Sequence, residues 1–327
     1  MVNWGIIGLG NMGLKFARSI KETNNSNLAG VASLNDKKLK FFQDNFKIDR
    51  KNLYKNYDDL INSNVIDSVY IATLNNSHLD LIKKCAEHKK NILCEKPIAL
   101  NYEEALNALK YINKNKIIFF EAIAFRSHPQ TKIVKQIIDK NEIGEIISVE
   151  STFGFKVKKI NPTSRLFNKE LGGGSILDLG CYPMSTLSFL FDKKGKYKFT
   201  NTSGSFAYTD VDDSAEAMIL INDQVECKIK VSIRENLHNK TIITGTQGKL
   251  IINNPWLPEK KTTLDIEINN SSYKKFINSE LSIFANQTQK IAENFQNNVI
   301  GDEFLVDIDD SLNIMKNLTE WSKLIRK

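Results

Sequence analysis

The segment that most constrains the fold is the N-terminal stretch of the chain. A short apolar run at residues 2–7 leads directly into G-x-G-x-x-G at residues 8–13, and an amphipathic stretch follows at residues 14–21. Strand, glycine turn and helix in this order form the fingerprint of a dinucleotide-binding βαβ unit. A plain glycine-rich turn is the alternative, but the flanking strand and helix favour a cofactor site. The residues expected to contact a dinucleotide here are Gly8, Gly10, Asn11, Met12 and Gly13.

The first part of the chain alternates short apolar runs with amphipathic stretches. This alternation predicts βαβ units and a parallel sheet covered by helices. The expected strands are residues 4–7, 28–34, 68–73, 91–94 and 116–120, and the expected helices are residues 14–21, 37–46, 77–89 and 102–113. We predict an α/β domain over residues 1–122, with a Rossmann-type, doubly wound parallel sheet.

After residue 122 the pattern changes to a period of two. Cys227 and Ile229 fall on one face of an expected strand, and Lys228 and Lys230 fall on the other. The expected strands are residues 145–155, 215–221, 225–233, 241–244, 249–252 and 263–268, followed by helices at residues 279–297 and 310–327. Because 327 residues exceed one core of about 100–200 residues, we expect a second domain at residues 123–327. It should be an α+β domain with a large, open, mostly antiparallel sheet.

Composition excludes several classes of protein. Hydrophobic residues make up 41% and charged residues 25%, which is typical of a soluble globular protein. The net charge of +7 comes from scattered lysines, which indicate a solvated surface and no nucleic-acid partner. The cysteines at 85, 94, 181 and 227 lack metal-ligand spacing, so we expect no metal and reduced thiols. With no leader and no apolar run of about 18 residues, we expect a cytoplasmic protein without a membrane span.

The second expected strand bears on the choice between NAD and NADP. NAD enzymes usually place an acid on the ribose 2′-hydroxyl about 20 residues beyond the fingerprint. This chain has Ser33-Leu34-Asn35 there, so a 2′-phosphate would not be repelled, and NADP is favoured over NAD. The alternatives are that Asp36 still bonds the ribose, or that the lysines after it only begin a helix. The candidates for bonding a 2′-phosphate are Ser33, Asn35, Lys37 and Lys38.

Two further segments could carry chemistry. The apolar run at residues 91–94 ends in Glu95-Lys96-Pro97, and the carboxyl end of a parallel strand faces the ligand crevice, so Lys96 should point toward a nicotinamide. A cis Lys96-Pro97 bond would fix the aim of that side chain. A solvated lysine is the alternative.

The second segment joins a glycine loop at residues 172–174 to an apolar helical stretch. Asp178 and Tyr182 are four residues apart, so on a helix they share one face. An aspartate among apolar residues is costly to bury without a partner. The alternative is a helix cap at Asp178 and a core position for Tyr182.

Together with two further motifs, these segments resemble the glucose-fructose oxidoreductase/inositol dehydrogenase (Gfo/Idh/MocA) family, and the resemblance covers nearly the whole chain. The motifs that carry the resemblance are the glycine turn at residues 8–13, Ala72-Thr73-Leu74-Asn75-Asn76-Ser77-His78, Glu95-Lys96-Pro97, Glu121-Ala122 with Arg126 and Pro129, and residues 172–182. Tyr182, where the inositol branch has His, is similar to the branch of dihydrodiol dehydrogenases, NADP-dependent xylose dehydrogenases and glucose-fructose oxidoreductase. Leu74 departs from the usual Pro and puts the loop over the nicotinamide in doubt.

The resemblance implies an NAD(P)-dependent oxidoreductase that moves hydride between nicotinamide and a hydroxyl or carbonyl carbon of a sugar or cyclic diol. Lys96 would be catalytic, Tyr182 the general acid/base, and Asp178 the residue that orients or charge-balances the pair. Further expected cofactor contacts are Ser33, Leu34, Lys38, Thr73, Leu74, Asn75, His78, Glu95, Lys96 and Arg165. Expected substrate contacts are Lys96, Glu121, Arg126 and Tyr182.

The sequence is also compatible with two other functions. A catalytically inactive, cofactor-sensing regulator is one alternative, although the chain retains both Lys96 and Tyr182. An NAD-dependent glycosidase of the same family is the other. Because the expected helices are too few to cover both faces of the second sheet, we also expect a homodimer or homotetramer joined through its open face. Lys228 and Lys230 moderate this expectation, since they could form a solvated face.

Overall fold

The computed structural model describes residues 1–191, 193, 195–269 and 271–327, and they form two compact units. The first unit contains residues 1–99, 103–126 and 281–311, and the second contains residues 100–102, 127–280 and 312–327. These units divide the chain differently from a single boundary after residue 122. The expected helix at residues 279–297 is present, but it belongs to the first unit and not to the second.

The first unit is built on a parallel sheet of six strands in the order β3-β2-β1-β4-β5-β6. Its strands are β1 (Val2–Ile7), β2 (Ser26–Ala32), β3 (Leu53–Tyr54), β4 (Ser68–Ile71), β5 (Asn91–Cys94) and β6 (Phe119–Glu121). Its helices are α1 (Asn11–Ile20), α2 (Asp36–Phe46), α3 (Tyr57–Asn62), α4 (His78–Glu87), α5 (Tyr102–Asn115) and α8 (Ile283–Asn297). The order reverses between β1 and β4, so the predicted doubly wound Rossmann sheet is confirmed.

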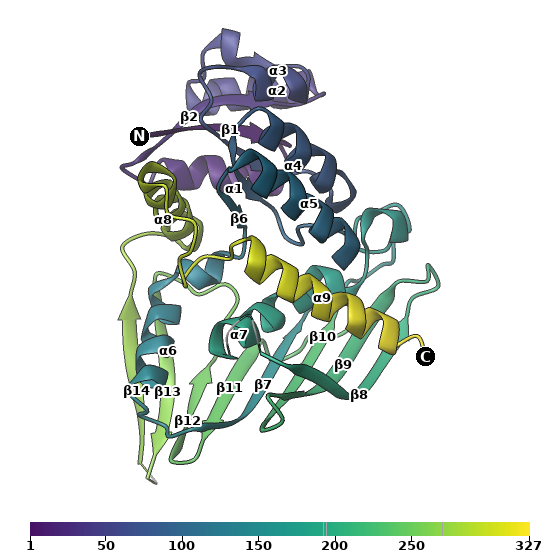
Figure 1. The fold of residues 1–327 in the computed structure, drawn as a ribbon, viewed down its shortest axis with the longest axis vertical. Helices are drawn as coiled ribbons and strands as arrows, with labels where there is room; N and C mark the ends of the chain where they lie inside the picture. Colours follow the sequence, from purple (N-terminus) through teal and green to yellow (C-terminus); the bar gives the residue numbers. More distant parts are fainter. Residues whose placement is uncertain (192, 194, 270) are drawn as a thin grey trace. The chain divides into compact units, whose positions relative to one another are not determined.

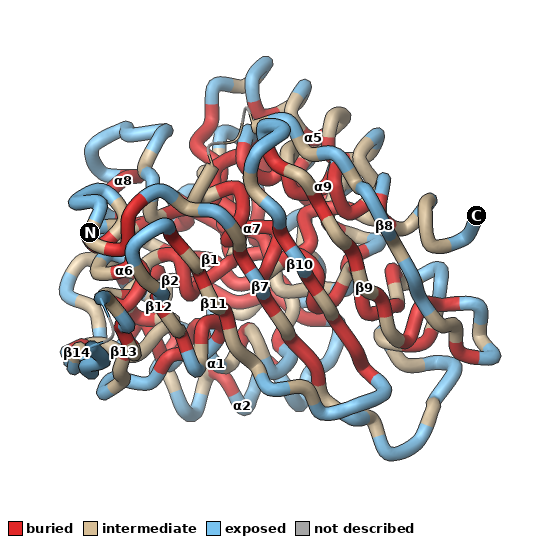
Figure 2. Tube along the Cα trace, turned by 90° about the horizontal axis from the view of Figure 1, so that it is seen from below, coloured by how far each residue is buried: buried red, intermediate tan, exposed pale blue. Residues whose placement is uncertain are grey.

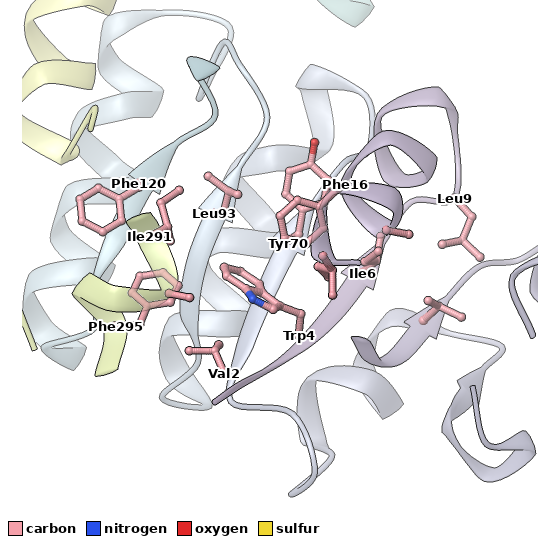
Figure 3. Packing of buried hydrophobic residues seen from close by; sticks show 14 of the residues in the cluster. Val2, Trp4, Ile6, Leu9, Phe16, Tyr70, Leu93, Phe120, Ile291 and Phe295 are labelled. Carbon is pink, nitrogen blue, oxygen red and sulfur yellow. The ribbon is translucent and has the colours of Figure 1, made fainter. Parts of the chain in front are cut away.

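Aromatic side chains hold one face of this sheet to α1 and α8 (Figure 3). The Trp4 ring lies edge-on to Phe16 of α1 at 5.1 Å and at 5.5 Å from Phe295 of α8. Phe295 also stacks on Phe120 of β6 at 5.8 Å. Aromatic pairs at these distances add to the free energy of burial. A late segment of the chain therefore completes the core of the N-terminal sheet.

The second unit is built on a sheet of eight strands in the order β14-β13-β12-β11-β7-β10-β9-β8. The strands are β7 (Ile146–Gly154), β8 (Tyr197–Phe206), β9 (Asp212–Ile221), β10 (Val225–Ser232), β11 (Lys240–Gly245), β12 (Gly248–Ile252), β13 (Lys261–Ile268) and β14 (Ser271–Asn278). Only the central pair, β7 and β10, is parallel among the described strands of this sheet. The expected open, mostly antiparallel sheet is thus confirmed.

Helices lie on one face of this sheet, namely α6 (Pro129–Asp139), α7 (Cys181–Phe191) and the greater part of α9 (Ile308–Leu324) (Figure 1). Strands β11, β7, β10 and β9 cross the front of Figure 2 with α7 and α9 behind them, and buried residues alternate with more exposed ones along them. On the exposed face Lys228 Nζ lies 2.9 Å from Glu216 Oε1. Among the described residues no helix is both long and apolar enough to cross a membrane.

Candidate active site

The glycine turn between β1 and α1 has a different constraint at each glycine. Gly8 has φ +94°, and a Cβ on Gly13 would lie 2.4 Å from the Gly8 carbonyl oxygen. Around Gly10, by contrast, no heavy atom of the described chain other than those of Gly10 and its neighbours in sequence lies within 4 Å of where a Cβ would stand. Gly10 also precedes α1 without a side-chain cap, and the first turn of α1 holds no acid. The open backbone and uncapped helix start fit a bound diphosphate.

A cavity of about 300 Å³ lies beside this turn. Its lining residues are Leu9, Gly10, Asn11, Leu14, Asn35, Lys37, Lys38, Phe41 and Phe42, with no carboxylate among them. Asn35 caps α2 by accepting a hydrogen bond from the Lys38 amide at 3.2 Å. The carboxylate of Asp36 lies 3.0 Å from Lys55 on the surface. The cavity therefore combines apolar walls with two lysines.

The segment after β4 is tied to the end of β5. Ser77 Oγ donates to Thr73 Oγ1 at 2.7 Å, which closes the turn before α4. His78 is fully buried, and its Nδ1 lies 2.9 Å from the Pro97 carbonyl oxygen. Burial lowers the pKa of His78 to about 4, so the ring is neutral and Nδ1–H donates to that oxygen. Asn75 is also buried, whereas Leu74 is exposed.

Lys96 follows β5 at the carboxyl edge of the parallel sheet. Strands β1, β4 and β5 are parallel neighbours, so the glycine turn and Lys96 lie at the same edge. The preceding Glu95 is buried and accepts a hydrogen bond from the Tyr70 hydroxyl. The Lys96-Pro97 bond is cis, and Lys96 itself is half-buried.

Glu121 and Arg126 lie inside the first unit. Glu121 Oε1 accepts a hydrogen bond from the Ile98 amide at 2.9 Å, and burial raises its pKa to about 7. The Arg126 guanidinium donates to the Glu303 carbonyl oxygen at 2.6 Å and lies 3.3 Å from Asp310 Oδ2. Their exposed fractions are 1% and 2%, so neither side chain presents a surface to a ligand in this structure.

In the second unit, the glycine loop leads into a π-helical turn, Ile176–Gly180, and then into α7. Asp178 lies in the π-helical turn and is buried, with its Oδ1 at 2.6 Å from Arg165 Nη1. The buried carboxylate thus has the partner that its environment demands. Arg165, expected at the cofactor, is half-exposed and holds Asp178 in this unit.

Tyr182 is the second residue of α7 and is half-buried. Its ring lies edge-on to Phe153 of β7 at 5.0 Å and 6.0 Å from Trp256. Phe153 and Trp256 stack at 5.7 Å, and the Trp256 indole N–H donates to the Thr152 carbonyl oxygen at 3.1 Å. These two side chains give Tyr182 a rigid aromatic wall. The sequence offered no signal for Trp256, which lies outside the expected strands and helices.

Models of two domains from one protein family match this chain. Residues 2–123 match the GFO/IDH/MocA oxidoreductase family with its NAD-binding Rossmann fold, and residues 131–251 match the GFO/IDH/MocA C-terminal domain. A trans-1,2-dihydrobenzene-1,2-diol dehydrogenase of Xenopus tropicalis is 28% identical over 78% of this chain and 76% of its own length. A D-xylose 1-dehydrogenase (NADP(+)) of Haloferax volcanii is 27% identical over 61% of this chain and 60% of its own.

Solved structures share the fold over nearly the full length. The aldose-aldose oxidoreductase from Caulobacter crescentus gives a TM-score of 0.90 at 20% identity, covering 99% of this chain and 97% of its own. A 3-ketoreductase from Actinomadura kijaniata in complex with NADP gives 0.86 at 20% identity, covering 97% and 95%. The matching family profiles, the glycine turn and the sheet order agree. The chain belongs to the Gfo/Idh/MocA family of oxidoreductases.

Proposed function

We propose that this protein is an NADP-preferring dehydrogenase or reductase that acts on a hydroxyl or carbonyl carbon of a sugar or cyclic diol. The observation that carries the proposal is the placement of Lys96 at the same sheet edge as the glycine turn. A dinucleotide held at that turn extends along the carboxyl ends of the strands. A half-buried ammonium group at this edge suits the polarisation of a reacting oxygen.

The chemistry divides between two side chains. Bound NAD(P) would supply the two-electron acceptor or donor for the substrate carbon. Tyr182 takes the hydroxyl proton during oxidation and returns it during reduction. Lys96 stabilises negative charge on the substrate oxygen. Asp178, paired with Arg165, holds the helical turn before Tyr182.

The substrate class rests on the relatives. The dehydrogenases named above act on a cyclic diol and on xylose, which both present neighbouring hydroxyl groups on a ring. Phe153 and Trp256 are buried beside Tyr182, so they hold the Tyr182 ring in place and do not themselves form a surface for substrate. Glu121 and Arg126 are buried in the first unit, so we assign them no contact with substrate.

The test is a panel of aldoses, inositols, dihydrodiols and deoxy-ketosugars, followed through nicotinamide absorbance with NAD and NADP. With an active substrate, Lys96→Met should lower kcat by roughly 10²–10⁴-fold while the dinucleotide still binds. Exposed Lys110→Met is the matched control and should leave kcat unchanged. Near-normal turnover by Lys96→Met would refute the mechanism. Redox-neutral turnover with retained cofactor would indicate the glycosidase, and binding without turnover would indicate the regulator.

We propose NADP because the cavity beside the glycine turn has lysines and no carboxylate among its lining residues. Lys38→Glu should raise the dissociation constant of NADP about 10- to 100-fold, the range of one charge-assisted hydrogen bond, and that of NAD far less. Lys40→Glu, on the same helix but outside the cavity lining, is the control. Fluorescence titration decides the matter. Tighter NAD binding by the wild-type protein would refute the preference.

We also propose a homodimer or homotetramer formed through the face of the second sheet that lies opposite α6, α7 and α9. Met218 and Ile242 are only partly buried on this face, which also carries the ion pair of Lys228 with Glu216. A partner would cover this apolar surface. Light scattering should report a multiple of 37.2 kDa. A monomer at micromolar concentration would refute association, and a dimer unchanged by Lys228→Glu would place the interface elsewhere.

A further inference from the structure

The helical segment that carries Asp178 and Tyr182 has an unusual beginning. Its first turn, Ile176–Gly180, is π-helical, a form that occurs mainly as single turns at functional sites. The residue at its N-cap position, Ser175, forms no side-chain cap with the helix. Backbone amide groups at a helix start need an acceptor when they are buried. The acceptor must therefore come from elsewhere in the unit.

Asp212, the first residue of β9, supplies that acceptor. Its Oδ2 accepts hydrogen bonds from Ser175 Oγ and from the Ile176 amide, both at 2.7 Å. Its other oxygen, Oδ1, lies 2.3 Å from where a Cβ on Gly174 would stand. Gly174 has φ +118°, a conformation that suits glycine. The glycine thus gives the carboxylate room to reach the helix start.

The neighbouring residue Asp213 has a different environment. Its carboxylate accepts a hydrogen bond from Ser205 Oγ at 2.5 Å and lies 3.2 Å from Arg234 Nη1. Only one of the two carboxylates meets the helix start. The pairing of β8 with β9 shifts register here, with Ser205 opposite Ser214 and Phe206 opposite Asp212, so Asp213 is the extra residue of a bulge that interrupts the alternation of side chains. Both side chains are buried, so Asp213 is a matched comparison for Asp212.

We infer that Asp212 is a positioning residue, which caps the π-helical turn from a separate strand and so holds Asp178 and Tyr182 in their working places. The negative carboxylate also interacts favourably with the positive end of the helix dipole. Burial raises the pKa of Asp212 to about 6, while the bonds from Ser175 and Ile176 oppose that rise. The carboxylate form therefore predominates above about pH 6, and so at neutral pH. The inference rests on the proposed role of Tyr182.

Three variants test it, namely Asp212→Ala, Asp212→Asn and Asp213→Ala. Asp212→Ala removes both hydrogen bonds, and it should lower kcat roughly 10- to 100-fold, as expected for a misplaced catalytic group. The dissociation constant of NADP, measured by fluorescence, should stay within about two-fold, because the glycine turn is untouched. Asp212→Asn keeps an oxygen acceptor and should recover most of kcat. Asp213→Ala should keep wild-type kcat.

Hydrogen exchange gives a readout that does not depend on catalysis. In Asp212→Ala the amides of residues 176–182 should exchange at least about 10-fold faster, with little change elsewhere in the unit. If Asp212→Ala does not fold, Ser175→Ala removes one of the two donors and should show smaller shifts in the same direction. Wild-type kcat and exchange in the variant that folds would overturn the inference. If instead Tyr182→Phe keeps full activity, the proposed function fails, and exchange alone decides whether Asp212 caps the turn.

Discussion

Replacing Glu121 with Gln should make the protein more stable at alkaline pH and change little in acid. Glu121 is 1% exposed, and burial raises its pKa from 4.5 to about 7. Between pH 4.5 and about 7, Glu121 therefore keeps its proton in the folded protein but loses it in the unfolded chain. The free-energy cost of ionising the buried Glu121 carboxyl is absent below the pKa that this group has in the unfolded chain. It reaches its full value above the pKa that the group has in the folded protein. A shift of about 2.5 units corresponds to about 3 kcal/mol of unfolding free energy above neutrality.

The Gln side chain is close in shape to the glutamate and keeps the bond from the Ile98 amide to Oε1. Urea unfolding of the wild type and of Glu121→Gln, measured from about pH 5 to pH 8, gives the difference directly. The difference should grow with pH in favour of Glu121→Gln. Exposed Glu87→Gln on α4 is the control and should follow the wild type. Parallel pH curves for the wild type and Glu121→Gln would refute the argument.

The remaining predictions concern a buried ion pair and the glycine turn. Asp310→Ala should lower the unfolding free energy by about 3–5 kcal/mol, because it removes the carboxylate that lies 3.3 Å from the buried Arg126 guanidinium. A loss under about 1 kcal/mol would show that the other groups around Arg126 suffice. Gly10→Ala should keep wild-type stability, since there is room for a methyl group. It should weaken dinucleotide binding at least about 10-fold, because the backbone can no longer approach a diphosphate. Gly13→Ala should lower both stability and dinucleotide affinity, since its Cβ would clash with the Gly8 oxygen at 2.4 Å. Thermal unfolding and a binding titration together distinguish Gly10→Ala from Gly13→Ala.

Apolar runs and their periods predicted much of the fold. The strand at residues 91–94 was expected with the bounds that it has, and the period of two on β10 matches its burial. The polar edge strand β14 and the two-residue β3 were missed, because hydrophobic pattern is absent from the first and too short in the second. Helix α6 was also missed. The parallel pairing of β7 with β10 depends on long-range contacts that periodicity does not report.

Less of the candidate site than of the fold could be predicted from the sequence. The glycine turn and Lys96 were predicted because each follows a recognisable strand. The spacing of Asp178 and Tyr182 was interpreted as a regular helix, but a π-helical turn begins the segment. The pairing of Asp178 with Arg165 and the cap from Asp212 join residues whose separation in the chain carries no periodic signal. Such contacts follow from tertiary structure.

The return of α8 to the N-terminal sheet has a consequence for how this protein could be divided or recombined. Residues 1–126 alone lack Ile291, Phe295 and Leu305, which are part of the core around Trp4. A fragment cut after residue 126 would expose the faces of Trp4 and Phe120 that Phe295 covers. An exchange of cofactor-binding units between relatives must therefore carry two separate pieces of gene, and a single crossover in this chain would produce a unit with an open core.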